Sequence, residues 1–288
     1  MADINANDVK NLREKTGAGI MECKKALIDT GGDFAKAEKL LKEKGLAAVE
    51  KRADRATNEG KIFIKVKGDG GEGTQAALVE LVSETDFVAR NPDFIVLGGV
   101  IADRVLEKGY TDPNDELSNM VSDLAAKIRE NMGLKRILLV KAAAGEYLTS
   151  YIHGDGALGV VVKIKSDKTE VFAKDEFKEL AHDLALHVAW ANPGALDQNS
   201  IDPEYVKENE SIFRKQMESD ESLKGKPEKV LEGILSGKVS KLLKSISFMD
   251  QMFIKDDKLT VSQVIANTGK TLGAALSVSA YTYFKVGV

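Results

Sequence analysis

Cysteine is nearly absent from this chain of 288 residues, which has only Cys23. A single cysteine excludes a disulfide within the chain and is typical of proteins from a reducing compartment. We expect Cys23 to pack as a small apolar residue on its helix. The sequence also has no apolar run of membrane-spanning length, and it opens without a signal or transit segment. These absences predict a protein of the cytoplasm.

An excess of positive charge is missing as well. Lysine and arginine together number 41, aspartate and glutamate 45, and the formal net charge is −4. Proteins that bind nucleic acids usually have a strongly basic surface, so the composition predicts no direct nucleic-acid partner. With 43% hydrophobic residues, the chain is long enough for two or three small domains with their own cores.

The motifs of common catalytic and cofactor sites are incomplete. Gly269-Lys270-Thr271 ends like a phosphate-binding loop, but Val264 stands where its first glycine is required. The segment from Gly68 to Gly73 matches G-x-G-x-x-G, yet it leads into a strand and not a helix, which favours a hairpin loop. None of the three histidines has metal-binding spacing, and we expect each at the surface or at a helix cap. The sequence therefore predicts no cofactor, no metal site and no enzyme.

Residues 4 to 45 have the pattern of three short helices. Asn5 and Asp33 have side chains that cap helix beginnings, and we expect them to start the first and third helices. Glycines at positions 17 and 45 should end those helices. The apolar face of the second helix is expected to consist of Ile20, Cys23 and Leu27. The charged residues 50 to 55 would then tether this helical module to the rest.

A strand and a helix are predicted on either side of the segment Thr85-Asp86-Phe87-Val88. The apolar run from Ala77 to Val82 is typical of a buried strand. Asn91-Pro92 has the N-cap and first-turn residues of a helix that continues to Glu107. Phe87 could fill a core while Asp86 caps a turn, or both could be exposed for a partner.

The same pattern of strand and amphipathic helix occurs a second time. Leu158 to Ile164 is followed by the helical pattern of Phe172 to Val188, and this repetition predicts two similar α+β subdomains. The apolar spacing is the same in Phe94, Leu97, Ile101, Val105 and in Phe177, Leu180, Leu184, Val188. The second copy has Glu170-Val171-Phe172 in place of the Asp-Phe pair. This difference favours a functional role for Asp86 and Phe87.

Residues 203 to 246 have two apolar helical stripes, separated by Gly225-Lys226-Pro227. Such a break predicts an antiparallel helical hairpin. The residues alone leave open whether the hairpin belongs to the globular core or protrudes as a coiled coil used for assembly. After it, the chain returns to the body at Lys258 to Ala266 and ends in the strand-like residues 280 to 288.

Four segments resemble the elongation factor Ts family, the guanine-nucleotide exchange factors for elongation factor Tu. They are Thr85 to Asn91, Leu12 to Leu27, Ser150 to Gly154 and Gln251 to Asp256, and they follow the family order. The resemblance implies an α+β fold with an N-terminal ubiquitin-associated-like three-helix module, two repeated subdomains with antiparallel sheets and an inserted helical hairpin. The implied domains are residues 1–55, 56–148, 149–202 with 247–288, and 203–246.

The resemblance also implies a function in translation elongation during protein biosynthesis. The chain is expected to bind elongation factor Tu·GDP and promote GDP release so that GTP can rebind, without membrane binding or covalent chemistry. The residues that the resemblance assigns to partner binding are Thr85, Asp86, Phe87, Val88, Arg13, Ile20, Met21 and His153. A homodimer or a two-to-two complex with the partner stays open. The alternative function is a non-catalytic protein-binding scaffold, which leaves the Asp-Phe pair without a role.

Overall fold

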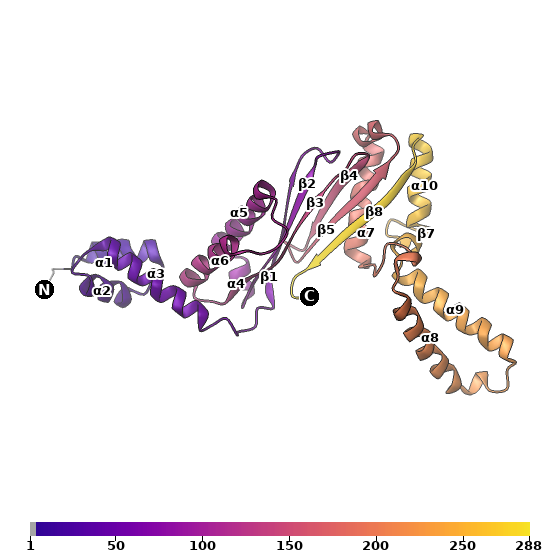
Figure 1. The fold of residues 1–288 in the computed structure, drawn as a ribbon, viewed down its shortest axis with the longest axis horizontal. Coiled ribbons are helices and arrows are strands. Elements are labelled where there is room, and N and C mark those ends of the chain that lie inside the picture. The colour runs from indigo at the N-terminus through magenta and orange to yellow at the C-terminus, as the bar shows by residue number, and fades with distance from the viewer. Residues whose placement is uncertain (1–3) are drawn as a thin grey trace.

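The computed structural model describes residues 4–288 and has an α+β fold in which N-terminal helices precede antiparallel sheets interleaved with helices (Figure 1). The N-terminal helices are α1 (Ala6–Thr16), α2 (Ile20–Asp29) and α3 (Phe34–Glu50). Asn5 and Asp33 cap α1 and α3 as predicted, with their carboxamide and carboxylate oxygens accepting from the N–H groups of Asn7 (2.9 Å) and Lys36 (3.0 Å). Within residues 4–288, no helix has both the length and the apolar character needed to cross a membrane.

The three helices enclose a small apolar core. Cys23 is buried in it, which confirms its expected packing role. Ile20 was expected on the same inward face but is 55% exposed, because it is the first residue of α2 and lies beyond the contact with α1 and α3. The buried residues of this core are Val9, Leu12, Cys23, Ala26, Leu27, Ala37 and Leu41.

Gly45 does not end α3, and that prediction is wrong. The helix continues to Glu50, and a Cβ atom at position 45 would lie 3.0 Å from the Cβ atom of Ala126 in α6 (Asp115–Ile128). The absence of a side chain at position 45 therefore allows α3 to approach α6 closely, and it does not end the helix. The Nζ of Lys42 and the carboxylate of Asp123 form an ion pair at 2.9 Å across the same contact.

Two antiparallel three-stranded sheets form the body of the molecule. The first has the order β1-β2-β3, and its strands are β1 (Glu59–Lys67), β2 (Gln75–Ser83) and β3 (Met132–Lys141). The second has the order β4-β5-β8, and its strands are β4 (Glu146–His153), β5 (Leu158–Ser166) and β8 (Leu276–Lys285). The glycine-rich residues 68–73 join β1 to β2 as the predicted hairpin loop.

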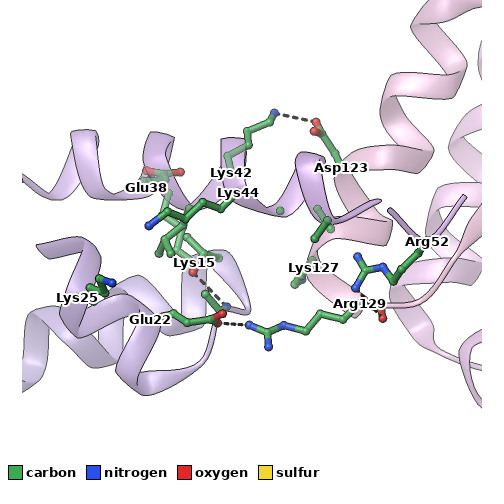
Figure 2. Close-up of a pocket in the computed structure, with 16 residues that line it drawn as sticks. Lys15, Glu22, Lys25, Glu38, Lys42, Lys44, Arg52, Asp123, Lys127 and Arg129 are labelled. Atoms are coloured by element: carbon green, nitrogen blue, oxygen red, sulfur yellow. Dashed lines mark hydrogen bonds and ion pairs between the residues drawn. The ribbon is translucent and has the colours of Figure 1, made fainter. Parts of the chain in front are cut away.

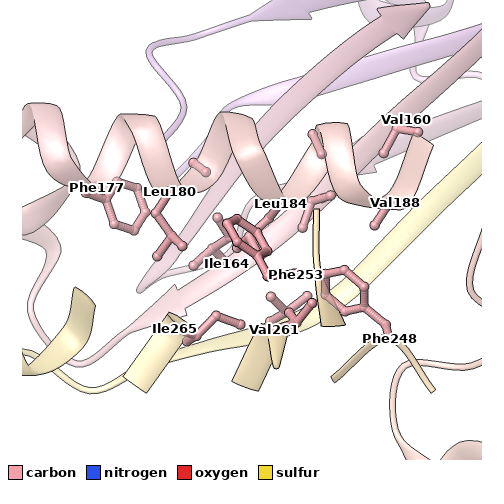
Figure 3. Packing of buried hydrophobic residues seen from close by; sticks show 14 of the residues in the cluster. Val160, Ile164, Phe177, Leu180, Leu184, Val188, Phe248, Phe253, Val261 and Ile265 are labelled. Atoms are coloured by element: carbon pink, nitrogen blue, oxygen red, sulfur yellow. The ribbon is translucent and has the colours of Figure 1, made fainter. Parts of the chain in front are cut away.

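The sheets pack face to face, and helices cover their outer faces. Leu78 on β2 contacts residues of the second sheet, whereas the next residue, Val79, packs under α5 (Pro92–Lys108). Both faces of β2 are therefore buried, which explains its continuous apolar run. Helices α7 (Asp175–Ala191) and α10 (Val261–Leu272) lie on the second sheet, where their apolar side chains interdigitate (Figure 3).

A buried carboxylate joins the last residues of the chain to the first sheet. Glu80 lies in the middle of β2, and its oxygens accept from the Nε of Arg136 (2.6 Å) and the N–H of Gly287 (3.1 Å). The guanidinium of Arg136 also lies over the ring of Phe284 in β8 at 4.0 Å. The charge of Glu80 is thus paired and hydrogen-bonded, as a buried carboxylate requires.

The predicted helical hairpin consists of α8 (Pro203–Glu218) and α9 (Glu228–Ile246), and it projects from the body (Figure 1). Within these two helices only Met217 and Leu235 are buried. The hairpin is therefore not part of the globular core. The short strands β6 (Met252–Phe253) and β7 (Asp256–Thr260) follow it and lead the chain into α10.

His187 is buried in the second core, so the prediction of a surface or capping histidine is wrong for this residue. Its Nδ1 accepts from the N–H of Ile254 (3.1 Å), which places the ring proton on Nε2, where it donates to Gln251 Oε1 (3.0 Å). Burial lowers the pKa of His187 below its ordinary value, because the charged imidazolium would lose hydration.

The free energy of unfolding should therefore decrease as the pH falls below about 6.5, the ordinary pKa of histidine. The unfolded chain then binds a proton that the folded chain does not, so acid favours unfolding, while above about pH 7 the contribution is fully present. Urea unfolding between about pH 5 and pH 7.5 measures this slope. His187→Gln should flatten the dependence of the unfolding free energy on pH, whereas His182→Gln, at an exposed position, should keep it. Equal slopes in both variants would contradict the assignment of this pH dependence to His187.

Candidate functional site

The exposed phenylalanine at the end of the first sheet is the centre of the candidate site. It lies on α4 (Asp86–Ala89), a single helical turn between β2 and α5. Phe87 is 81% exposed, whereas the next residues, Val88 and Ala89, are 6% and 4% exposed. Phe87 thus does not fill the core. The second half of the turn anchors it to the core, and the first half displays an aromatic ring to solvent.

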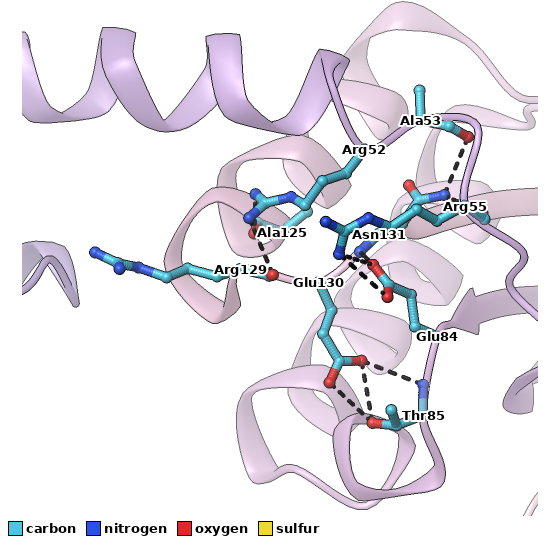
Figure 4. Close-up of polar contacts among 9 residues, drawn as sticks. All are labelled: Arg52, Ala53, Arg55, Glu84, Thr85, Ala125, Arg129, Glu130 and Asn131. Carbon is cyan, nitrogen blue, oxygen red and sulfur yellow. Dashed lines mark hydrogen bonds and ion pairs between the residues drawn. The ribbon is translucent and has the colours of Figure 1, made fainter.

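Thr85, and not Asp86, caps this turn. The Thr85 hydroxyl oxygen accepts from the N–H of Val88 at 3.3 Å. Asp86 instead pairs with the guanidinium of Arg90 at 3.1 Å, and about half of its side chain remains exposed. Both donors of Thr85, the N–H and the hydroxyl, are bonded to the carboxylate of Glu130, at 3.2 Å and 3.0 Å (Figure 4).

The corresponding segment of the second sheet has the opposite arrangement. Val171 and Phe172 lie in a 3-10 helix between β5 and α7, and both are buried. The Phe172 ring packs against those of Phe177 (4.9 Å between centroids) and Tyr147 (5.3 Å). The aromatic residue of this second connector is therefore buried in the core. The exposure of Phe87 is a property of the first connector alone.

The other predicted partner-binding residues lie on separate elements. Arg13 is exposed on α1, and Ile20 and Met21, the latter 73% exposed, begin α2. His153 is exposed at the end of β4, with its Nδ1 3.0 Å from the hydroxyl of Tyr151. Within residues 4–288, no hydrogen bond or ion pair joins these groups to Phe87 directly. Val88 is buried, so it supports the site from within.

A cleft of about 550 Å³ separates the N-terminal helices from α6 (Figure 2). Its lining is rich in lysine and arginine, but its three carboxylates each pair with a basic residue. Lys15 binds Glu38 (2.6 Å), Lys42 binds Asp123, and Arg129 binds Glu22 of α2. The Glu22 carboxylate also accepts from the N–H of Gly19 (2.9 Å), and this bond, together with Arg129, lowers the pKa of Glu22. The cleft is a polar seam between the helical module and the body.

Comparison with known proteins identifies the family. The family model described as Elongation factor TS matches residues 84–288, which is more than half of the chain. The chain belongs to the elongation factor Ts family. It is 49% identical to elongation factor Ts of Treponema denticola over 286 residues, covering 99% of both chains. It is 39% identical to that of Borreliella burgdorferi over the full length of both, and 38% identical to that of Clostridium acetobutylicum over 99% of this chain and 92% of the relative.

Membership in the family defines the class of activity. Elongation factor Ts promotes nucleotide exchange on elongation factor Tu during translation elongation and is not an enzyme, and this chain has that function. The matched residues begin at Glu84, immediately before Thr85, the N-cap of the exposed turn. Sequence reasoning missed Glu130, which lies 45 positions from Thr85 and belongs to no motif.

Replacing Phe87 with alanine should change the free energy of unfolding by less than about 0.5 kcal/mol, because the ring contacts little of its own chain. Phe94→Ala is the matched control. Phe94 lies on the inward face of α5 and is fully buried, and its removal should cost about 3–5 kcal/mol. Urea unfolding of both variants measures the difference. A large loss of stability in Phe87→Ala would mean that the ring packs in a core after all.

Proposed function

We propose that Phe87 is the apolar wedge with which this chain opens the nucleotide site of elongation factor Tu·GDP, and that Asp86 is the polar group beside it. The observation that carries this proposal is the 81% exposure of Phe87 on a turn anchored by its own neighbours. An aromatic ring that is held in solvent can bury its apolar surface against a partner, and that burial is favourable. Thr85 and Val88 hold the turn from either side.

The physical basis of the exchange is differential binding. The factor favours the partner conformation that no longer holds GDP, and by linkage GDP weakens the binding of the factor equally. Accelerating GDP release about 10⁴-fold requires about 5.5 kcal/mol. Burial of one phenylalanine contributes roughly 1.5–3 kcal/mol. Phe87 therefore acts within a broader interface.

We assign the remainder of that interface to two further surfaces. One is the start of α2 with Ile20 and Met21, joined by Arg13 on α1; the other contains His153 at the end of β4. Ile20 and Met21 are exposed apolar side chains on helices that have their own small core. Such an arrangement suits residues 1–55 acting as a ubiquitin-associated-like module that binds the partner, while residues 56–148 present Phe87.

Exchange kinetics test the role of Phe87 directly. The release of a fluorescent GDP from elongation factor Tu is measured with rising concentrations of the chain, in a buffer that contains magnesium. The measurement gives the saturating rate of release and the concentration of the chain at which half of that rate is reached. Phe87→Ala should lower the saturating rate at least tenfold, since the lost burial is worth more than about 1.4 kcal/mol.

Two variants serve as comparisons in that assay. Val66→Ala removes an exposed apolar side chain from β1 and should behave like the unmodified chain. Met21→Asp should raise the half-saturating concentration and should lower the saturating rate less than Phe87→Ala does, because Met21 adds to the binding surface while Phe87 enters the partner. If Phe87→Ala releases GDP at the full rate, the wedge lies elsewhere.

We propose that the helical hairpin, residues 203–246, is an assembly surface, through which a homodimer or a two-to-two complex would form. Val230 and Ile212 are exposed apolar residues on its two helices. Ile212→Asp with Val230→Asp should lower the mass of the assembled species in sedimentation velocity while leaving the saturating exchange rate intact. An unchanged sedimentation profile together with a collapsed exchange rate would place the hairpin at the nucleotide site.

A further inference from the structure

We propose that Glu130 is a positioning residue for nucleotide exchange, whose carboxylate fixes the direction in which the turn α4 presents Phe87. This inference rests on the proposed role of Phe87. Glu130 lies in the three-residue segment 129–131 between α6 and β3, on a different part of the chain from α4. It does not touch the exposed ring, so its effect passes through Thr85.

The carboxylate of Glu130 binds every donor that Thr85 has. It accepts from the Thr85 N–H at 3.2 Å and from the hydroxyl at 3.0 Å to each oxygen. The same hydroxyl oxygen accepts from the N–H of Val88 at 3.3 Å. A continuous chain of hydrogen bonds thus runs from Glu130 through Thr85 into the turn. The carbonyl of Thr85 is also bonded, by the hydroxyl of Ser83 at 3.0 Å.

Phe87 needs this support because the turn is too short to hold its own shape. A helix of four residues has the entropy cost of nucleation and few internal hydrogen bonds to offset it. Val88 and Ala89 anchor the end of the turn in the core, whereas its first half has no buried side chain. Bonds from Glu130 to the N-cap fix the other end. A wedge held in its binding geometry loses less entropy when it enters a partner.

The neighbours of Glu130 connect the same segment to the N-terminal helices (Figure 4). The side-chain amide of Asn131 donates to the carbonyls of Ala53 (3.1 Å) and Arg55 (2.7 Å) in the tether. The carbonyl of Arg129 accepts from the guanidinium of Arg52 (3.0 Å).

The side chain of Arg129 completes this connection through its ion pair with Glu22 of α2. Three consecutive residues thus bind the module, the tether and the N-cap of the Phe87 turn. Segment 129–131 therefore sets where the wedge lies relative to the exposed apolar residues at the start of α2. A shift of this segment would move both partner-facing surfaces together.

Glu130→Gln tests the proposal in the full chain. Glutamine keeps the size of the side chain but removes its negative charge and replaces one acceptor oxygen by an amide nitrogen, so the bonds from Thr85 lose their charge assistance. The saturating rate of GDP release should fall about tenfold, with little change in the half-saturating concentration. Glu107→Gln, which removes an exposed ion-paired carboxylate on α5, is the matched control and should exchange normally.

Two readouts separate positioning from a general structural role. Amide hydrogen exchange of the free protein should become faster in residues 84–91 of Glu130→Gln and stay unchanged in the strands. In a Phe87→Ala background, Glu130→Gln should cause almost no further loss of exchange activity, because Glu130 acts through that ring. Thermal unfolding midpoints of Glu130→Gln and Glu107→Gln should agree within a few degrees.

The proposal is overturned if Glu130→Gln exchanges nucleotide at the normal rate, or if its loss adds fully to that of Phe87→Ala. Unchanged hydrogen exchange in residues 84–91 overturns it as well. If Phe87→Ala alone retains full exchange activity, the proposed role of Phe87 fails. The hydrogen-exchange comparison still decides in that case whether Glu130 orders the turn.

Discussion

A single helical turn is unstable by itself, and the candidate site consists of one. The structure solves this problem by burying the second half of the turn, Val88 and Ala89, in the core beneath α5. Hydrogen bonds from Thr85 stabilise the other half. Because both ends are fixed, Phe87 between them can be exposed without becoming disordered. An exposed aromatic ring on a flexible loop would instead lose conformational entropy on every encounter with a partner, which weakens binding.

The anchors in turn depend on the packing of the two sheets. Leu78 and Val79 are consecutive residues of β2, yet one contacts the second sheet and the other contacts α5. The first sheet is therefore a central layer with apolar material on both sides. Its strand β2 ends at Ser83, two residues before Thr85, the N-cap of the exposed turn. The position of Phe87 is consequently defined by the most deeply buried strand of the molecule and not by a surface loop.

Local sequence signals predicted much of the fold. The apolar run of β2, the Asn91-Pro92 helix start and the glycine-rich hairpin each depend on a few adjacent residues, and all three are confirmed. Contacts between distant segments were not predictable in this way. Gly45 faces Ala126, and His187 is bonded to Gln251. The predictions of a helix end at Gly45 and of a surface position for His187 were therefore wrong. The motif that contains Phe87 is visible in the sequence, and family membership confirms the nucleotide-exchange function of the chain. The exposure of Phe87 and the bonds from Thr85 to Glu130 are tertiary properties, which no local pattern reveals.

The strand order of the second sheet has a consequence for synthesis of the chain. β5 is the central strand, and its Val160 pairs with Tyr283 of β8, which begins roughly 110 residues after β5 ends. A ribosome therefore needs on the order of ten seconds to supply the missing partner of β5. During that interval the first sheet, complete at Lys141, can already fold, while one edge of β5 stays unpaired in the nascent chain. That open edge is a hazard for misassembly, so the nascent protein is most vulnerable to aggregation between the synthesis of β5 and the synthesis of β8.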